Sequence, residues 1–405
     1  MAMAREKKIV LLLSFCQALF MTGNSLQFIL GGLVGAMIAD NKALSTLPLT
    51  ATIVGVMCST IPASLFMKRY GRRRGFMAAA VLGSSMMALA AYAVYARNFW
   101  LFTFAMLLYG GYGGFAQYFR FAAADVASPQ FRSRAISYVL AGGIAAAVAG
   151  PTLAKWSTDL FAPITFMGGY VVVSCLSLAA FALLSFLDIP RPSAADAQAA
   201  GRPMSRIMAQ PVFIVAVLSG MIGYGVMSLV MTSTPLAMIG CGFAVTDAAD
   251  VIQWHILGMF VPSLFTGQLI GRFGLLNVML TGVGLLLLCT VIAVSGLTWI
   301  HFAVALTLLG LGWNFTFVGA STLLTEAYEP AERAKTQAAN DFLVFGTVSL
   351  SSLSSGALLH FFDWNTVNYM ALPLVLVCGS ALVWLKAYRR RAARAGAGPD
   401  GQRPA

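Results

Sequence analysis

Charged residues are scarce in this chain of 405 residues, where Asp, Glu, Lys and Arg together make up only 10%. An average soluble domain carries about 25%. Hydrophobic residues make up 59%, and the mean hydropathy is +0.81. This composition excludes an ordinary water-soluble protein and indicates that lipid surrounds most of the chain.

Cysteine and histidine are also few. The six cysteines stand alone along the chain without a CxxC pair, and the three histidines form no H-E-x-x-H motif. We therefore predict no disulfide framework, no metal site and no enzyme active site. A G-x-x-x-x-G-K-[ST] loop is missing too, so we expect no ATP site and no other cofactor.

Long apolar stretches fill the sequence instead. A membrane-spanning helix needs about 20 apolar residues, so the chain has room for twelve such helices with short connections. The predicted spans are residues 9–37, 46–67, 76–95, 99–123, 135–155, 165–187, 211–239, 249–270, 275–296, 299–323, 337–359 and 366–386. Arg5, Lys7 and Lys8 resemble the start of a signal peptide, but the following apolar run is too long for one, so we predict a retained helix.

Positive charge is distributed unevenly between the predicted loops. Most Lys and Arg residues fall in segments that lie on the same side of the membrane as the N-terminus. The exceptions are Lys42, Arg97 and Lys155 in the other loops and Arg120 within a span. By the positive-inside rule both termini are predicted to be cytoplasmic. The positive-inside pattern then explains the net charge of +12. We expect the basic segments to be attracted to anionic lipid and not to bind nucleic acid.

The chain also repeats itself after about 200 residues. Arg69-Tyr70-Gly71 returns as Arg272-Phe273-Gly274, and the spacing of Asp125, Pro129, Arg132 and Arg134 returns in Glu326, Pro330, Arg333 and Lys335. An internal repeat predicts two pseudo-symmetric six-helix bundles, an all-α membrane fold. We predict bundles at 1–189 and 209–387, a cytoplasmic linker at 190–208 rich in Pro, Ala and Ser, and a basic disordered tail at 388–405.

Residues 64–73, SLFMKRYGRR, and 267–274, GQLIGRFG, resemble the G-x-L-x-D-R-x-G-R-[RK] signature of the major facilitator superfamily of secondary transporters. The resemblance extends over about residues 9 to 387 and implies transport by alternating access. Lys68 stands where the family usually has Asp, a carboxylate near the cytoplasmic start of span eleven. Either Lys68 points elsewhere or this latch is weakened.

An acid followed seven residues later by arginine occurs after spans four and ten and is similar to the E-x6-R element of sugar porters. In the family such charges form ion pairs that hold the cytoplasmic gate shut. The resemblance implies a gate made by Arg69, Arg72, Asp125, Arg132, Arg272, Glu326 and Arg333. The alternative is a solvated basic surface, because single surface ion pairs contribute only about 0–1 kcal/mol.

Polar and aromatic residues at membrane depth indicate the substrate cavity, because polar groups facing lipid are costly. Their helical spacing puts those of span one, and those of span four, on single faces. The predicted cavity residues are Gln17, Asn24, Gln27, Tyr109, Tyr112, Tyr224, Trp313, Asn314 and Phe317. The repeat aligns Tyr112 with Trp313, which predicts an aromatic clamp for a flat ligand, against the alternative of ordinary packing.

Arg120, His255 and Asp341 are the ionisable residues predicted within spans, and none has a counterpart in the other half. We therefore expect them to serve substrate binding or proton coupling. Our hypothesis is that Arg120 and Asp341 form a gated pair or bind a polar group of the substrate. Asp341 at the membrane interface and His255 as a hydrogen-bonded core residue are the alternatives.

Residues 325–330 and 337–342 resemble a bacterial branch of the superfamily that includes riboflavin uptake carriers. The expected protein is a monomeric transporter of a bacterial inner membrane, which takes up a small neutral or aromatic nutrient such as a vitamin, with protons. A proton-coupled drug efflux antiporter is the alternative, since Gly150-Pro151 partly matches an antiporter motif. A sensor that binds without transport is the second alternative.

Overall fold

The computed structural model describes residues 2–41, 44, 47–189 and 201–395, and within these ranges all regular elements are helices. The first half contains α1 (Ala2–Ile38), α2 (Leu47–Tyr70), α3 (Arg72–Tyr95), α4 (Phe99–Ala116), α5 (Phe119–Val126), α6 (Arg132–Ala141), α7 (Gly143–Ser157) and α8 (Met167–Ser185). The second half contains α10 (Met204–Met208), α11 (Pro211–Gly240), α12 (Val245–Phe260), α13 (Ser263–Phe273), α14 (Leu275–Ser295), α15 (Trp299–Leu324), η2 (Pro330–Glu332), α16 (Arg333–Phe361) and α17 (Trp364–Ala395).

These helices make the membrane segments that hydropathy predicts. Among the described residues, ten segments are long and apolar enough to cross a membrane, α4 with α5 and α6 with α7 each forming one of them. The pair α12 and α13 forms an eleventh, bent by 41°. Helix α16, 29 residues long, lies at the remaining predicted span. The predicted fold class is therefore confirmed.

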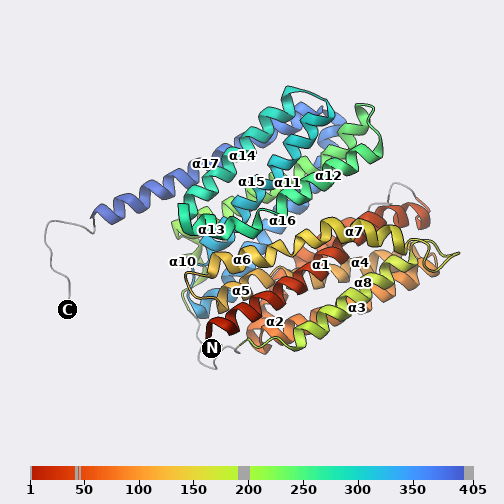
Figure 1. The fold of residues 1–405 in the computed structure, drawn as a ribbon, viewed down its shortest axis with the longest axis horizontal. Coiled ribbons are helices and arrows are strands. Elements are labelled where there is room, and N and C mark those ends of the chain that lie inside the picture. The colour runs from red at the N-terminus through yellow and green to blue at the C-terminus, as the bar shows by residue number, and fades with distance from the viewer. Residues whose placement is uncertain (1, 42–43, 45–46, 190–200, 396–405) are drawn as a thin grey trace.

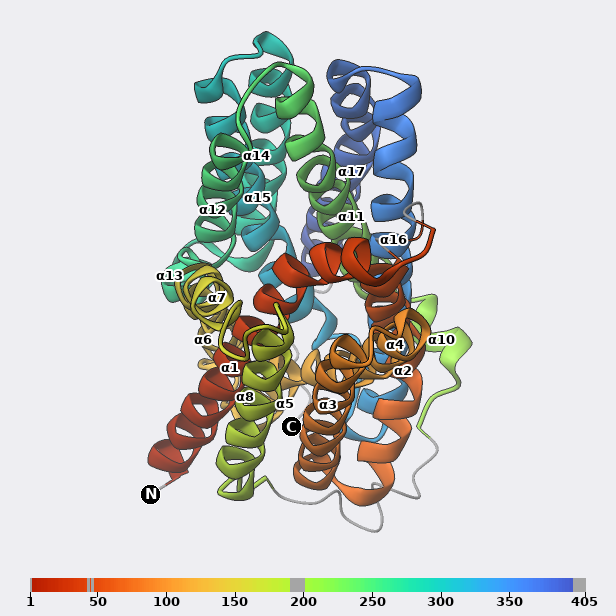
Figure 2. The same cartoon turned by 90° about the vertical axis from the view of Figure 1, so that its right-hand side faces the viewer.

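The helices form two bundles that lie side by side (Figures 1 and 2). In the first bundle α2 packs on α4, α3 on α8 and α1 on α7, and in the second α14 and α12 pack on α15 and α11 on α16. Between the bundles, α2 packs against α16 and α6 against α13. The buried hydrophobic residues of both bundles form one continuous core, and a few helices make the joint.

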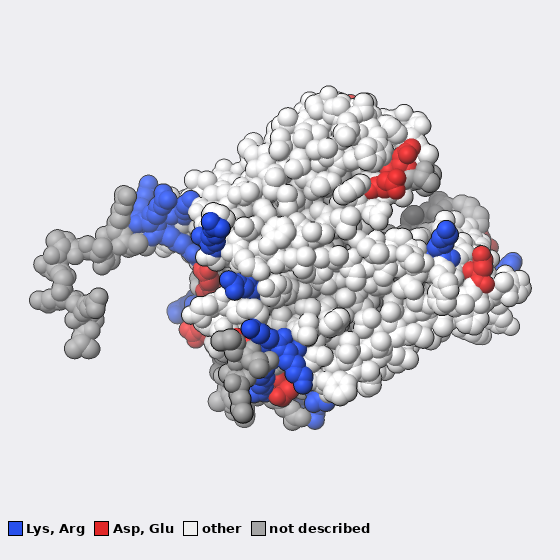
Figure 3. Space-filling view, viewed as in Figure 1, with Lys and Arg blue, Asp and Glu red and all other residues white. Residues whose placement is uncertain are grey.

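The start of α1 and the end of α17 lie at one end of the molecule (Figure 1). On the face shown in Figure 3, Lys and Arg side chains gather at that same end, whereas the flank of the bundles is almost free of charge. We call this end, where α2, α5 and α13 terminate and α16 begins, the basic end. An uncharged flank between polar ends is the surface that a bilayer requires.

Glycines set the distance between the helices that hold the site. A Cβ atom added to Gly55 of α2 would lie 2.0 Å from the carbonyl oxygen of Leu107, and one added to Gly110 of α4 would lie 2.3 Å from that of Thr52. Only glycine permits such backbone contact. Because α5 continues from α4, this contact also constrains the position of α5, which packs on α6 and α1.

The C-terminal part differs from the prediction. A disordered tail is predicted from residue 388, but α17 continues to Ala395. The sequence of this last stretch, YRRRAARA, consists mainly of Arg and Ala, which are strong helix formers. Most of the predicted linker, residues 190–200, and the last residues of the tail, 396–405, lie outside the described residues, and the predicted domain boundaries stay predictions.

Candidate functional site

An ion pair joins the two halves inside the molecule. The Nη2 atom of Arg120 on α5 lies 2.5 Å from the Oδ1 atom of Asp341 on α16, and the two side chains are 2% and 0% exposed. Asp341 is eight residues beyond the start of α16, roughly 12 Å along the helix at 1.5 Å per residue. The structure thus brings together the two residues that the sequence suggested as a gated pair, and places Asp341 away from the helix end.

Neighbouring amides hold both partners of this pair. Arg120 Nη1 donates to the backbone and side-chain oxygens of Gln117, both at 2.9 Å, and Asn340 Nδ2 donates to Asp341 Oδ1 at 2.9 Å. Gln117 stands at the interruption between α4 and α5, where its carbonyl is free to accept. A buried ion pair is stable only with such additional hydrogen bonds, because both charges have lost their water.

Aromatic rings surround the ion pair. The guanidinium carbon of Arg120 lies 4.5 Å from the ring centre of Phe121 and 4.9 Å from that of Phe317. Phe317 stacks on Trp313 at 4.9 Å, and Tyr224 meets both rings edge-on at 5.2–5.3 Å. We call Tyr224, Trp313 and Phe317, with Phe345 at 5.6 Å from Tyr224, the aromatic cluster. Three of these four were predicted to line the substrate cavity.

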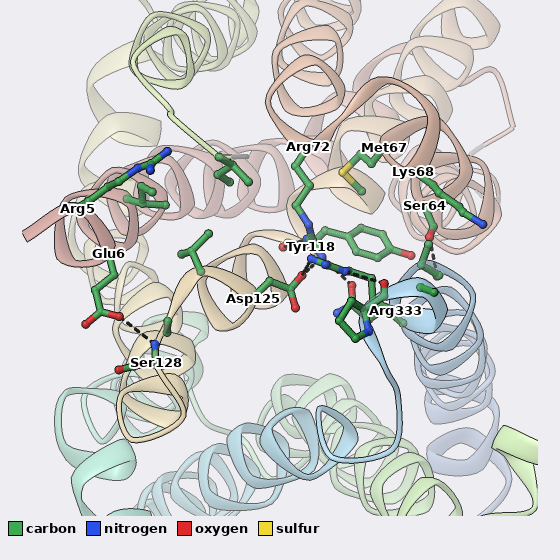
Figure 4. A pocket seen from close by; sticks show the side chains of 18 of the residues that line it. Arg5, Glu6, Ser64, Met67, Lys68, Arg72, Tyr118, Asp125, Ser128 and Arg333 are labelled. Carbon is green, nitrogen blue, oxygen red and sulfur yellow. Dashed lines mark hydrogen bonds and ion pairs between the residues drawn. The ribbon is translucent and has the colours of Figure 1, made fainter. Parts of the chain in front are cut away.

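A second group of charges joins the halves at the basic end (Figure 4). Asp125 of α5 accepts a hydrogen bond from Arg72 of α3 and pairs with Arg333 of α16 at 3.3 Å. Arg72 also donates to Gln337 at 3.0 Å and to the carbonyl oxygen of Tyr118 at 3.2 Å. One carboxylate therefore links two arginines from opposite halves.

The predicted gate residues were not assigned to particular partners, and the structure shows which of these charges pair. Asp125 pairs with Arg333 of the other repeat, and Glu326 pairs with Arg389 of α17 at 2.6 Å. Arg132 makes no ion pair in the part of the chain that the structure describes.

Arg69 and Arg272 also differ from the predicted gate. Arg69 lies over the ring of Tyr70 at 5.4 Å, and Arg272 over the ring of Phe273 at 5.3 Å. Each stacks on its own sequence neighbour, so neither contributes an ion pair between the halves among the described residues. The symmetry of these two contacts follows from the repeated Arg-aromatic-Gly motif.

A cavity of about 920 Å³ opens at the basic end between the halves. Its lining includes Arg5, Lys68, Arg72, Asp125 and Arg333 (Figure 4). The Lys68 side chain points away from the pair of Asp125 and Arg333 in this view. Of the two possibilities for Lys68, the structure therefore favours the one in which it points elsewhere.

Uncharged contacts that the sequence did not predict complete the joint. Ser64 donates to the carbonyl oxygen of Ala334 at 2.6 Å, and Gln268 donates to Tyr138 at 3.0 Å. A Cβ atom added to Gly267 would lie 2.5 Å from Arg134 Cα of the opposite half. The only sequence signal was the position of Ser64 and Gly267 at matching places in the two repeated motifs.

Another missed contact ties the end of the linker to α16. Arg202 donates to Glu332 through its backbone N, Nε and Nη2 at 2.6–2.8 Å, and the Glu332 side chain is fully buried. Lys335 in turn donates to the carbonyl oxygen of Arg202. These Arg202 hydrogen bonds lower the pKa of Glu332 to about 2. We call Arg202, Glu332 and Lys335 the linker clamp; it adjoins Arg333 of the joint.

Tyr109 and Tyr112 do not face the other half, which corrects the predicted clamp between Tyr112 and Trp313. The ring of Tyr112 packs against Gly83 of α3 and lies 5.1 Å from Phe20 of α1. The ring centres of Tyr109 and Tyr112 are 6.0 Å apart, and both side chains are 1% exposed. The absence of a side chain at Gly83 makes room for the ring inside the first bundle, so the repeat alignment did not determine its direction.

Asn314 lies buried within the second bundle, and its role in the cavity stays a prediction. Its Nδ2 donates to Met259 O at 2.6 Å and contacts Ser263 Oγ, while its Oδ1 accepts from Thr266 at 2.6 Å. These partners flank the break between α12 and α13, where Pro262 has no N–H to donate. Asn314 therefore stabilises the bend.

His255 lies in the packing between α12 and α15. It is fully buried, and its Nδ1 is 2.8 Å from the carbonyl oxygen of Leu306. His255 therefore fits the alternative interpretation, in which it is a hydrogen-bonded core residue. It belongs neither to the pair of Arg120 and Asp341 nor to the aromatic cluster.

The three polar residues of α1 that were predicted to line the cavity differ in their exposure. Gln27 is fully buried and donates to Thr52 of α2 at 3.4 Å, and Gln17 is 4% exposed. Asn24 is partly exposed. A substrate-binding role for these amides stays a prediction.

Two helical bundles that bury an ion pair across their joint define a membrane transport protein, and comparisons with known proteins agree. The profile of the Major Facilitator Superfamily matches residues 13–252 and 242–405. The chain is 40% identical over 378 residues to the riboflavin transporter RfnT of Brucella anthropi, covering 92% of this chain and 94% of the relative. It is 27% identical over 385 residues to the uncharacterized MFS-type transporter YdeG of Bacillus subtilis, covering 91% and 88%.

Solved structures show the same fold. The outward conformation of FucP has a TM-score of 0.74 at 13% identity, over 92% of this chain and 98% of that one. The human organic anion transporter MFSD10 also has a TM-score of 0.74, at 14% identity, over 93% and 99%. The chain belongs to the Major Facilitator Superfamily and is a transporter, not an enzyme.

Proposed function

We propose that this transporter takes up riboflavin, or a closely related neutral aromatic vitamin, together with protons. The observation that carries this proposal is the 40% identity to a riboflavin transporter over nearly the full length of both chains. Identity at this level, spread across both halves, favours a shared substrate class more than a shared fold alone does.

The aromatic cluster supports this substrate class. Trp313 and Phe317 present stacked rings with an interplanar angle of 16°, and Tyr224 and Phe345 add edges around them. A flat ring system gains both buried area and stacking from such surroundings. The adjacent Arg120 and Asp341 supply polar groups that fix the orientation of a ligand, the usual composition of a small-molecule site.

The ion pair supports coupling to protons. Arg120 and Asp341 belong to opposite halves, so opening of the basic end separates them. Separation of two buried charges is costly unless one is neutralised. Asp341 can take up a proton, whereas arginine stays charged. We infer that protonation of Asp341 favours the open basic end and that its deprotonation favours the closed one.

The proposal includes an orientation in the membrane. The basic end, with both termini, faces the cytoplasm of a bacterial cell, in accordance with the positive-inside rule. Uptake then ends at the basic end, where Asp125 and Arg333 join the halves. The chain acts as a monomer, since each copy has its own ion pair and aromatic cluster.

Counterflow in vesicles tests the substrate. Purified protein in liposomes loaded with unlabelled riboflavin is expected to take up labelled riboflavin, and liposomes loaded with glucose are not. Binding without counterflow would indicate a sensor. Loss of the protein from cells should reduce riboflavin uptake; increased sensitivity to toxic compounds, with unchanged uptake, would indicate efflux.

An imposed proton gradient tests the coupling. Acid outside is expected to drive accumulation of riboflavin by the wild type. Asp341→Asn should lose this accumulation and keep counterflow, because the amide does not exchange a proton. The control is His255→Gln, which alters an ionisable side chain remote from the pair and should keep accumulation. Unchanged accumulation by Asp341→Asn would reject its role.

A further inference from the structure

Each partner of the ion pair has one buried polar atom without a hydrogen-bond partner among the described residues. Arg120 uses Nη1 on Gln117 and Nη2 on Asp341, and Asp341 Oδ1 also accepts from Asn340. Arg120 Nε and Asp341 Oδ2 are buried and have no hydrogen-bond partner among the described residues. Buried polar atoms in native proteins nearly always have partners, and these two atoms from opposite halves are available to a ligand.

The surroundings limit the shape of that ligand. Phe121 and Phe317 lie over the guanidinium of Arg120 at 4.5 and 4.9 Å. Trp313, stacked on Phe317, has a buried Nε1 that also has no partner in the part of the chain described. These rings are packed together in the closed arrangement, so a flat ligand would have to displace one of them to turn its edge toward the ion pair.

The charge of the site is also limited. Arg120 and Asp341 neutralise each other, and their hydrogen-bonding neighbours Gln117 and Asn340 are uncharged. A negatively charged group on the ligand would therefore enter a neutral and largely apolar site without a free cation, which is unfavourable. The geometry selects a neutral molecule.

We propose that Arg120 Nε and Asp341 Oδ2 recognise an adjacent carbonyl and N–H on the edge of a neutral planar heterocycle. Arg120 donates to the carbonyl oxygen, and Asp341 accepts from the N–H. This inference rests on the proposed function, because the ring of riboflavin carries such an imide edge. The edge of the ligand would contact Arg120 in one half and Asp341 in the other. Its hydrogen bonds would then replace part of the contact between these two residues when the ion pair opens.

Ligands with single changes test the edge. Unlabelled competitors are compared for inhibition of labelled riboflavin counterflow in wild-type proteoliposomes. Lumiflavin keeps the ring and imide edge without the sugar chain, and should compete within about tenfold of riboflavin. 3-Methylriboflavin, which lacks the N–H, should be at least about tenfold weaker, or about 1.4 kcal/mol. Equal competition by 3-methylriboflavin overturns the assignment of the edge.

A variant of Asp341 tests whether this residue accepts the N–H that 3-methylriboflavin lacks. In Asp341→Asn the penalty for 3-methylriboflavin relative to riboflavin should shrink, because the amide is a poorer match for the N–H in both ligands. Tyr170→Phe removes an equally buried hydroxyl without a described partner, distant in the first bundle, and should keep the full penalty. A full penalty in Asp341→Asn would overturn the assignment to Asp341. If that variant does not fold, the wild-type comparison decides alone.

A failure of the proposed function is distinguishable from a failure of this inference. If riboflavin shows no counterflow, the proposed substrate is wrong, and the edge is tested by thermal shift with lumichrome, xanthine and uracil against their N-methylated forms. Stabilisation by the parent rings only would support the inference. Equal stabilisation by the methylated rings, or none by any parent ring, would overturn it.

Discussion

The buried ion pair and the ion pairs of the basic end each join an arginine to a carboxylate, but they differ in how far water reaches them. Arg120 and Asp341 are 2% and 0% exposed, whereas Arg389 and Glu326 are 36% and 43% exposed. Removal of one partner of a buried pair leaves an uncompensated charge, while an exposed partner is replaced by water. Both pairs are 2.5–2.6 Å apart, so distance does not distinguish them. They differ in exposure and in location, because Arg120 and Asp341 join the two halves whereas Arg389 and Glu326 lie within the second half. We therefore expect the buried pair to contribute more to stability.

The pair of Asp125 with Arg333 lies between these extremes. The Asp125 side chain is 12% exposed and that of Arg333 is 34% exposed. It joins the halves as the buried pair does, but at the cavity of the basic end, where water has access. We therefore expect it to contribute less than the buried pair and more than Arg389 with Glu326.

The largest effect is expected from breaking the buried pair on its acidic side. Asp341→Asn leaves a buried guanidinium that cannot lose its proton, so the unfolding free energy should fall by about 3–5 kcal/mol. Arg120→Gln should cost less, because the remaining carboxyl can neutralise itself by binding a proton. Denaturant unfolding in detergent at pH 7 measures both. The double variant should be more stable than Asp341→Asn; strict additivity of the two losses would contradict the pairing.

A smaller effect is expected from packing at the joint, without any change of charge. In Gly267→Ala the new Cβ would lie 2.5 Å from Arg134 Cα, and backbone atoms cannot give way as a flexible side chain does. Overpacking of this kind costs about 1–3 kcal/mol and here opposes the closed basic end. Increased labelling of a cysteine placed at residue 64 would report the opening.

Gly271→Ala is the matched control for this variant. Gly271 is on the same helix, one turn further, and a Cβ there meets no atom within 4 Å. It should leave the labelling of the residue-64 cysteine unchanged. Similar labelling in both alanine variants would mean that the contact between α13 and α6 does not hold the basic end closed.

The linker clamp provides a test by pH. The pKa of Glu332 is lowered from 4.5 to about 2, so its stabilisation is complete above about pH 4.5 and is lost as the pH falls toward 2. Arg202→Gln removes the main cause of this lowered pKa. The difference in melting temperature between wild type and variant should be constant from pH 7 to 5 and shrink below about 4.5. A difference that grows on acidification would show that another group is responsible.

The helices could be predicted from the sequence because hydropathy and the positive-inside pattern are local properties. Arg120 and Asp341 could be singled out because neither charge is repeated in the other half, and a charge that symmetry does not require needs another reason. Both signals depend only on position along the chain, so they can be recognised without knowing how the helices pack.

The contacts between the halves could not be predicted in the same way. The partner of Asp125 is Arg333, more than 200 residues away, and spacing within a repeat carries no information about such a contact. Likewise, Tyr112 aligns with Trp313, but Gly83 directs it into its own bundle. Repeat alignment predicts which helix a residue occupies, and the packing of neighbours decides which way its side chain points.

The smallest effect is expected at the most exposed pair. Arg389→Ala removes the partner of Glu326, and both side chains already contact water, so stability should change by only about 0–1 kcal/mol and riboflavin counterflow should be unchanged. The same unfolding and counterflow measurements apply, at low and high salt, because screening should abolish even this small difference. A loss comparable to that of Asp341→Asn would show that exposure does not rank these pairs. The anchoring of α17 to the α15–α16 connection would then have to be counted with the buried pair as a determinant of the closed state.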